Sequence, residues 1–396
     1  MHRSLAFSKY LPDFGWDVSV LTVHPRAHEQ RLERNSDMVP KHVQLIRAPA
    51  WDAARHFAVA GRYPSALALP DRWSSWVPFG TRAGLAALRR QRHDAIFSTF
   101  PIASAHLIGR NLHDRSHLPW VADFRDPMAT ATYPHEPTLR ERWTRIQDEV
   151  MARASRVTVT TPGTARYYRD RYPQARPERV VVIENGFDPQ MFDGPPAAAP
   201  APAAAGAPVV LLHSGLLYPR ERDPKPFFRA LRRRVDDPGV GPDAIRVCLR
   251  ASGFEREYAA ILAELGLSNV VSLVGPLPYA DALREMQSAS ALLLFQAAVC
   301  NEQIPAKAYE YLYAGRPILG ITDPLGDTGQ LLRRFGVPGV SALEDEEGIL
   351  RMLRASLPMI EAGRYPTPAR EAVMAVSRKS GAELLARTLE EAVREQ

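Results

Sequence analysis

Residues 302–315 read EQIPAKAYEYLYAG, a pattern that predicts one short helix. Pro305 suits the first helical position, and Gly315 suits the position just past the end. Ile304 stands where a capping Ser, Thr, Asp or Asn is preferred, so the N–H groups of the first turn have no side-chain acceptor of their own. Lys307 adds a cation at the positive end of the helix, which is unfavourable unless an anion lies there. We therefore expect a phosphate at this helix start.

Two carboxylates frame the predicted helix. Glu302 precedes it, and Glu310 lies about one and a half turns inside it, so a polyol ligand along the helix start could meet one at each end. Ionised carboxylates accept hydrogen bonds from hydroxyls. A nucleotide sugar, with a diphosphate in the middle and hydroxyls at both ends, fits this arrangement. The alternative is a surface helix in which Lys307 pairs with Glu310 at i+3.

The same stretch resembles the donor-site motif of GT-B-fold glycosyltransferases of family 4, also called group 1 glycosyltransferases. That motif has two Glu separated by seven residues, then a small residue, Gly, and Pro with an apolar residue, here Glu302, Glu310, Ala314, Gly315, Pro317 and Ile318. The resemblance implies a bacterial enzyme that moves a sugar from a nucleotide-sugar donor to a hydroxyl acceptor with retention, in the synthesis of envelope polysaccharides, lipid-linked sugars or small molecules. It implies no cofactor and no metal.

The composition is that of a globular protein, with 396 residues, 45% of them hydrophobic and 24% charged, and a net charge of +6. This length predicts two domains. No apolar run approaches the ~18 residues that a membrane span needs, and no signal peptide is evident, so we expect a cytoplasmic protein. Cys248 and Cys300 indicate neither a disulfide framework nor a zinc site. Contact with the anionic inner face of the membrane stays open, whereas no motif supports nucleic-acid binding.

Strands and helices alternate along the chain, which predicts an α/β fold with parallel sheets. Under the resemblance this is the GT-B fold, two Rossmann-like doubly wound domains facing a cleft. We expect an acceptor-side domain over residues 1–193 and a nucleotide-sugar-binding domain over 209–365. Residues 194–208 are rich in Ala and Pro and uncharged, and predict a linker. Within 366–396 a single helix, Pro368–Val393, is expected to pack back toward the first domain.

The chain opens on a predicted helix, Ser4–Phe14, and a predicted strand, Val18–Val23. In the resembled family an earlier strand and a glycine-rich turn come first, at the place where the strand order reverses and ligands bind. We therefore expect an incomplete N-terminal domain, whose native product begins upstream of Met1 or which is a truncated copy.

Two strand ends in the first half carry candidate acceptor-side residues, because ligands of parallel sheets lie beyond the carboxyl ends of the strands. Thr99 stands near the turn where relatives place a His that faces the sugar. In the string DFRDP, Asp126 could accept the proton of an attacking hydroxyl, and Arg125 could orient an anionic acceptor. The alternative is a structural ion pair of Arg125 with an Asp, with Asp123 capping a turn.

The second half begins with a strand, a glycine turn and basic residues before a helix, which together predict an anion cradle. Gly215 is the glycine of that turn, and Arg222 matches one of two basic residues that grip the donor diphosphate in relatives. Leu216 takes the place of the other. A solvated run of charges is the alternative. Gly275 lies in the turn where relatives line the nucleobase.

Positive groups are expected to neutralise the departing diphosphate: Lys307, Arg222 and the helix start at Ile304 and Ala306. Glu302 would hold the sugar hydroxyls, and Glu310 the ribose diol. Catalytic roles are expected for Lys307, Glu302 and Asp126. Two other classes of protein stay open, an epimerase of nucleotide sugars on the same architecture and a non-catalytic paralogue.

Overall fold

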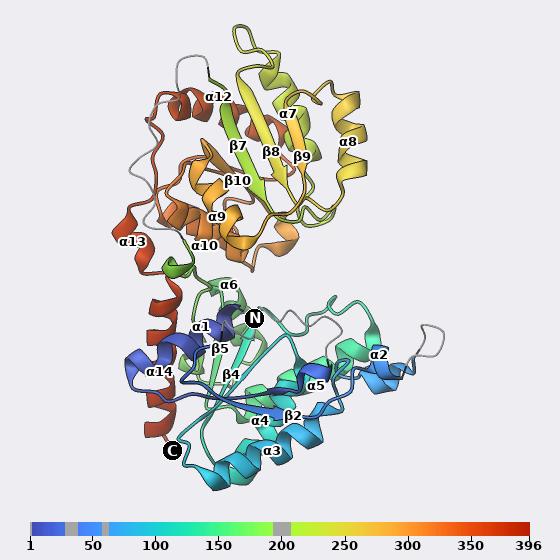
Figure 1. The fold of residues 1–396 in the computed structure, drawn as a ribbon, viewed down its shortest axis with the longest axis vertical. Helices are drawn as coiled ribbons and strands as arrows, with labels where there is room; N and C mark the ends of the chain where they lie inside the picture. Colours follow the sequence, from blue (N-terminus) through green and yellow to red (C-terminus); the bar gives the residue numbers. More distant parts are fainter. Residues whose placement is uncertain (1, 28–38, 58–62, 193–206) are drawn as a thin grey trace. The chain divides into compact units, whose positions relative to one another are not determined.

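The computed structural model describes residues 2–27, 39–57, 63–192 and 207–396, and the chain divides into two units (Figure 1). Unit 1 comprises Met1–Glu184 with Arg378–Gln396, and unit 2 comprises Asn185–Ser377. The end of the chain therefore belongs to the same unit as its beginning. The linker predicted over residues 194–208 lies outside the described residues, apart from Ala207 and Pro208.

Unit 1 is built on parallel strands in two separate sheets. The larger has the order β3-β4-β5-β6, with β3 Ile96–Thr99, β4 Trp120–Arg125, β5 Arg156–Val159 and β6 Val180–Val182. The strands β1 (Ser19–Val23) and β2 (Gln44–Ala48) pair with each other in a two-stranded parallel sheet. The predicted alternation of strands and helices is confirmed, but its strands do not form one continuous sheet.

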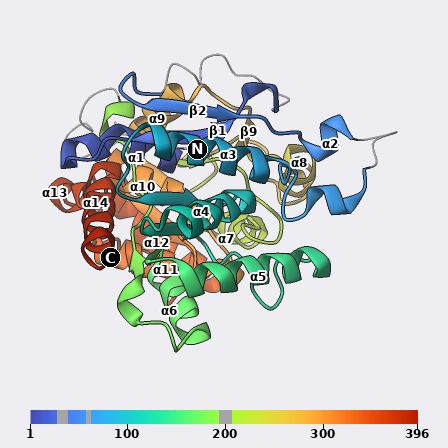
Figure 2. The same cartoon turned by 90° about the horizontal axis from the view of Figure 1, so that it is seen from below.

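Helices cover both faces of the larger sheet of unit 1. Trp120, Ala122 and Phe124 of β4 belong to one apolar cluster. The helices that bury this face are α3 Trp76–Arg90, α4 Ala103–Ser116, α5 Pro137–Arg153 and α6 Pro162–Arg171. On the other face, α1 (His2–Tyr10) and α14 (Arg378–Arg394) lie side by side and bury Val121 (Figures 1 and 2). Because side chains alternate along a strand, Asp123 points to the same face as Val121, toward α1.

Unit 2 contains one six-stranded parallel sheet with the order β12-β11-β10-β7-β8-β9. Its strands are β7 Val209–Ser214, β8 Ile245–Arg250, β9 Val271–Val274, β10 Ala291–Phe295, β11 Ile318–Ile321 and β12 Val340–Ser341. The chain runs outward from β7 to β9, returns to the other side of β7, and runs outward again from β10 to β12. The strand order therefore reverses between β7 and β10, the place where open α/β sheets bind ligands.

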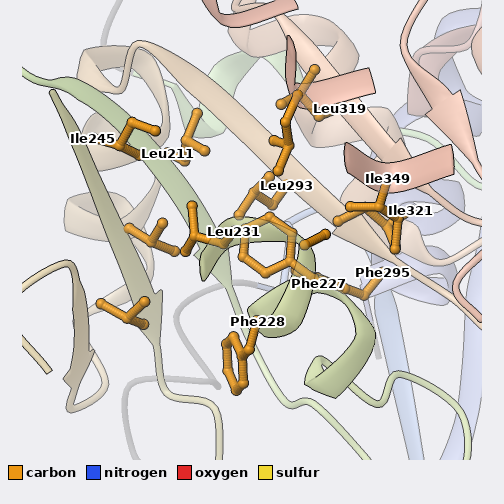
Figure 3. Packing of buried hydrophobic residues seen from close by; sticks show 14 of the residues in the cluster. Leu211, Phe227, Phe228, Leu231, Ile245, Leu293, Phe295, Leu319, Ile321 and Ile349 are labelled. Atoms are coloured by element: carbon orange, nitrogen blue, oxygen red, sulfur yellow. The ribbon is translucent and has the colours of Figure 1, made fainter. Parts of the chain in front are cut away.

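The core of unit 2 lies on both faces of its sheet. In β10, Leu293 and Phe295 belong to one apolar cluster, and Leu292 and Leu294 to the other, which is the period-two pattern of a strand buried on both sides. Figure 3 shows the first cluster, in which Phe227 lies close to Phe295. The helices are α7 Lys225–Val235, α8 Glu255–Glu264 and α12 Glu346–Glu361 on that face, and α9 Tyr279–Ser288, α10 Ala306–Ala314 and α11 Asp327–Arg334 on the opposite one.

The prediction of a single helix over Pro368–Val393 is wrong, because the chain passes from unit 2 to unit 1 within these residues. Two helices are present, α13 (Arg370–Met374) in unit 2 and α14 in unit 1. Between them Ser377 forms a parallel β-bridge with Phe187. The apolar residues of the two helices enter different cores, so one continuous helix could not bury both sets. Among the described helices, none combines the length and the apolar run needed to span a bilayer.

Candidate functional site

The start of α10 has no side-chain cap, as the sequence predicted, but it is shifted by one residue. Pro305 is the N-cap residue, with φ −64° and ψ 136°, and Ala306 is the first helical residue. The prediction that Pro305 is the first helical residue is therefore wrong. Ile304 is 6% exposed and packs into the apolar cluster beneath the helix, which explains an apolar residue here. Gly315 ends the helix in the left-handed region, with φ 69°.

The helix α10 is fixed at the point where the strand order of unit 2 reverses. It follows β10 in the chain, and it is tied to β7 through Tyr311, whose buried hydroxyl accepts a hydrogen bond of 3.0 Å from the N–H of Ser214. Ser214 is the last residue of β7. The start of α10 thus lies beside the carboxyl ends of both strands at the reversal point, where a ligand is expected.

The side chain of Lys307 extends from the first turn of α10 to the end of β7. Its Nζ lies 3.3 Å from Nε2 of His213. It also fills the space above Gly215, because a Cβ atom at that position would lie 2.8 Å from Nζ. Gly215 has a φ of +113°, in the region that favours glycine. A glycine is therefore needed at position 215 both for its backbone and for the room that the lysine occupies.

The surroundings of Lys307 disfavour its positive charge. Burial is the main cause, and the positive charge of Arg222 is the second. Together they lower the pKa of the amine from 10.5 to about 7, against a smaller opposing effect of Glu310. An anion bound next to Nζ would favour the charged form and raise this pKa again. An anion bound at this place would therefore oppose both the effect of burial and the charge of Arg222.

The partner of Lys307, His213, is a neutral imidazole. Burial and the charge of Lys307 hold the pKa of His213 well below 6.5. Its Nδ1 lies 2.9 Å from the carbonyl oxygen of Leu293, and its Nε2 lies 3.0 Å from that of Gly215. A neutral imidazole carries one N–H, so it can donate to only one of these two oxygens; in the tautomer that donates from Nδ1 to Leu293, Nε2 accepts from Lys307. This tautomer holds the lysine in place without cancelling its charge.

Two further donor-side residues act on Lys307. Arg222 donates from Nη1 to the carbonyl oxygen of Leu216 at 3.3 Å, and its guanidinium lies 5.5 Å from the centre of the Tyr218 ring. Glu310 accepts a hydrogen bond of 2.6 Å from the hydroxyl of Tyr279, on the neighbouring helix α9. The amine of Lys307 therefore lies next to Gly215, and the charges of Arg222 and Glu310 act on it.

The other predicted donor-side residues lie around this centre. Glu302 is exposed in the turn before α10, and Ala306 is exposed on its first turn. Gly275 follows β9, two strands away from β7, and its carbonyl oxygen accepts a hydrogen bond of 2.7 Å from Arg250. Within the described ranges, no three or more His, Cys, Asp or Glu side chains are grouped so that they could hold a metal ion.

In unit 1, Asp123 is the centre of a buried network that the sequence did not reveal. It is fully buried and accepts from Nε and Nη2 of Arg3 at 3.2 and 3.1 Å. The hydroxyls of Thr99 and Thr158 each donate to it at 2.8 Å. Burial alone would raise the pKa of Asp123, but the charge and hydrogen bonds of Arg3 outweigh this effect and lower it.

The predicted acceptor-side residues adjoin this network. Nε of Arg125 donates to the hydroxyl of Thr99 at 3.1 Å, so Thr99 links Arg125 to Asp123. The alternative, an ion pair of Arg125 with an Asp, is present as a contact of 3.6 Å with Asp123, whose direct partner is Arg3 at 3.1 Å. Burial raises the pKa of Asp126 despite the opposing charge of Arg125, and a carboxylate with a raised pKa is a stronger base.

Sequence reasoning missed His213 and Arg3 as members of these sites. His213 is a polar residue at the carboxyl end of an apolar strand, and that position could have marked it. His213 and Lys307 are far apart in the sequence, so no local pattern indicated their contact. Arg3 lies 120 positions before Asp123, and neither residue has a local pattern that pairs them.

The comparisons with known proteins agree with this fold. A sequence profile of the glycosyl transferase 4-like domain matches residues 3–186. Sucrose-phosphate synthase from Thermosynechococcus elongatus is 16% identical, with 98% of this chain and 92% of that chain covered and a TM-score of 0.63. Anabaena Alr3699/HepE in complex with UDP and glucose is 15% identical, with 98% and 95% covered and a TM-score of 0.64. A UDP-N-acetylglucosamine 2-epimerase is 12% identical, with 100% and 94% covered and a TM-score of 0.57.

No curated protein sequence matches the chain. The matched domain over residues 3–186 and the two parallel α/β units agree with the motif at residues 302–315. Residues 3–186 therefore match the glycosyl transferase 4-like domain, and the chain has the fold of the similar glycosyltransferase structures.

Proposed function

We propose that this protein transfers a sugar from a nucleotide-sugar donor to a hydroxyl group of an acceptor, with retention at the anomeric carbon and without a metal ion. The observation that carries this proposal is the position of Lys307. Its amine is held above Gly215, 3.3 Å from a neutral imidazole, and its pKa is lowered by burial and by the charge of Arg222, against a smaller opposing effect of Glu310. A diphosphate at the start of α10 would supply further negative charge.

The leaving group of this reaction is a nucleoside diphosphate, on which negative charge grows as the bond to the sugar breaks. Lys307 and Arg222 would stabilise that charge, together with the uncapped N–H groups at the start of α10, next to Ile304 and Ala306. Fixed positive groups of this kind stabilise a transition state most where water is excluded. The burial that lowers the pKa of Lys307 indicates such an environment.

The two ends of the donor would be held by carboxylates. In our proposal Glu302 accepts from the hydroxyls of the sugar, and Glu310, oriented by the hydroxyl of Tyr279, accepts from the ribose diol. Gly275 would line the nucleobase. The similar structure of HepE contains UDP and glucose, so UDP and UDP-glucose are the first probes to use.

The acceptor would bind to unit 1. We propose that Asp126 accepts the proton of the attacking hydroxyl, helped by its raised pKa, while Arg125 and Thr99 orient the acceptor. Activity should then rise with pH through the pKa of Asp126, because the protonated carboxyl cannot accept a proton. We place the reaction in the bacterial cytoplasm, on acceptors that serve the cell envelope, as the resemblance implies.

An epimerase is the second candidate, since a UDP-N-acetylglucosamine 2-epimerase has the same fold. The two reactions differ in what they need. A transferase releases nucleoside diphosphate and passes the sugar to an acceptor, whereas an epimerase converts the nucleotide sugar with no acceptor present. Products formed without an acceptor therefore distinguish them.

The test is to incubate the purified full chain with a panel of nucleotide sugars, with and without extracts that supply acceptors. We expect nucleoside diphosphate release and a retained anomeric configuration by NMR, both insensitive to EDTA, and loss of release in Lys307→Ala. Loss of turnover with EDTA contradicts metal independence. An epimerised nucleotide sugar without acceptor contradicts the transferase proposal, and failure to bind any nucleoside diphosphate favours a non-catalytic protein.

A further inference from the structure

The guanidinium of Arg125 has only part of its hydrogen bonding satisfied inside unit 1. Nε donates to the hydroxyl of Thr99 at 3.1 Å, and Nη2 donates to the hydroxyl of Ser4 at 3.2 Å. Among the described residues, Nη1 has no acceptor. The side chain of Arg125 is 19% exposed, so solvent or a ligand can reach it. A half-buried arginine with hydroxyl partners and an open N–H edge is arranged to receive a further acceptor.

The nearest carboxylate cannot supply that acceptor, because Asp123 is fully used. Its oxygens take two N–H bonds from Arg3 and one hydroxyl bond each from Thr99 and Thr158. An ionised carboxylate offers about four lone-pair positions, so these donors fill it. Two guanidiniums thus face one carboxylate. The other neighbouring acid, Asp126, favours the charged form of Arg125 less than Asp123 does.

The backbone around Arg125 is held in a conformation that ordinary side chains seldom adopt. Its φ is +65°, and the pairing of β4 with β5 shifts register between Asp123 and Arg125. The carbonyl oxygen of Arg125 accepts from the N–H and the hydroxyl of Thr160, at 2.8 and 3.0 Å. These bonds fix the strained turn and so fix the direction of the side chain. Strain at the carboxyl end of a parallel strand is typical of a ligand site.

We propose that Arg125 and Ser4 form a subsite for an oxyanion group of the acceptor, a phosphate or a carboxylate, so that the acceptor is an anionic molecule. This inference rests on the proposed function and names the chemical class of its acceptor. The planar fork of an arginine binds two oxygens of such a group at once, and the Ser4 hydroxyl can add a further donor. With a neutral sugar acceptor, the charge of Arg125 would be offset only by Asp123, 3.6 Å from its Nε, and by Asp126.

Calorimetric titration with inorganic phosphate tests the subsite in the Lys307→Ala background, in which the diphosphate site of unit 2 is weakened. We expect one phosphate to bind with a dissociation constant on the order of millimolar, about tenfold or more weaker after Arg125→Gln is added. Arg92→Gln is the matched control, because Arg92 is an exposed arginine in unit 1. Absence of phosphate binding, or binding unchanged by Arg125→Gln, overturns the proposal.

Two additions keep the test decisive. Arg125→Lys retains the charge without the fork and should weaken phosphate binding to an intermediate degree, so it replaces Arg125→Gln if that variant does not fold. Co-sedimentation with 1:1 phosphatidylglycerol and phosphatidylcholine vesicles then identifies the source of the oxyanion. If binding to the vesicles depends on Arg125, the oxyanion belongs to a lipid headgroup. If vesicle binding does not depend on Arg125 but phosphate binding does, the oxyanion belongs to a soluble acceptor. UDP binding to the parent chain, measured separately, reports on the proposed function alone.

Discussion

Arg3 in unit 1 and Lys307 in unit 2 are both cations enclosed by the fold, but their charges are offset in different ways. Arg3 makes two hydrogen bonds to the carboxylate of Asp123 and a third, of 3.0 Å, to the carbonyl oxygen of Glu184. Lys307 has a neutral histidine as its near partner and a second cation, Arg222, in its field. The fold itself compensates the charge of Arg3, whereas Glu310 offsets that of Lys307 only in part, and we expect a ligand to supply the rest.

This difference separates a structural cation from a functional one. When a buried charge has a complete set of partners, removing one partner is destabilising because the other is left buried and uncompensated. A buried charge without a counter-charge costs stability, and it is retained for a task that requires it. Variants of Arg3 should therefore change stability, and variants of Lys307 should change activity.

Arg3→Ala should have the largest effect, a loss of about 3–5 kcal/mol in the free energy of unfolding, because it leaves the buried carboxylate of Asp123 unpaired. Urea denaturation measures this loss. Folding lowers the pKa of Asp123, so its ionisation stabilises unit 1 above pH 3.8 and this contribution disappears as the pH falls through the lowered value. Arg92→Ala, at an exposed ion pair, should be neutral. A comparable loss in both variants would contradict the structural role of Arg3.

Lys307→Ala should act on function rather than on stability. We expect kcat/KM for the nucleotide sugar to fall about 10²–10³-fold, about 3–4 kcal/mol of transition-state stabilisation. Its unfolding free energy should not decrease, since a poorly compensated charge is removed. Lys379→Ala is the control, because Lys379 is an exposed lysine that pairs with Asp13. Parental turnover in Lys307→Ala would contradict the assignment.

Gly215→Ala should reproduce part of this loss without changing any charge. The added methyl group would lie 2.8 Å from Nζ of Lys307, so the amine must move. We expect affinity for nucleoside diphosphate to weaken about ten- to hundredfold, about 1.4–2.8 kcal/mol, measured by calorimetry. Gly336→Ala is the matched control, because Gly336 also has a positive φ, +74°, but nothing lies within 4 Å of its added methyl. Equal weakening in both variants would show that backbone strain, not the lysine, is responsible.

Glu310→Gln should have the smallest effect, about 1 kcal/mol in nucleotide affinity, because the amide oxygen can still accept from one hydroxyl. The comparison of UDP with 2′,3′-dideoxy-UDP sharpens this prediction. If Glu310 holds the ribose diol, the substitution should weaken UDP and leave the dideoxy compound unchanged. An equal loss for both ligands would place Glu310 elsewhere in the site.

The sequence predicted the α/β alternation and the uncapped start of α10 because both follow from local patterns. Short apolar runs mark most of the strands, and Pro305 and Gly315 mark the bounds of the helix to within one residue. Lys307 stood out for the same reason, as a cation at the wrong end of a helix. Glu302 and Glu310 followed from spacing and resemblance, and their roles stay predictions.

Other features depend on contacts between distant parts of the chain. The division of the last helix at Ser377 depends on which core each half enters, and no local pattern specifies that. The same holds for the pairing of Lys307 with His213 and for the network around Asp123. Burial of charges is a property of the packed structure, so the lowered pKa of Lys307 could not be predicted from its neighbours in sequence.

The proton balance of nucleotide binding tests the central claim most directly. With a pKa of about 7, the amine of Lys307 is about nine-tenths neutral at pH 8, and a bound diphosphate should restore the charged form. Calorimetry of UDP binding at pH 8, in buffers with different ionisation enthalpies, should therefore show uptake of close to one proton in the parent chain and none in Lys307→Ala. Tight UDP binding without proton uptake, or with equal uptake in both proteins, would contradict the account.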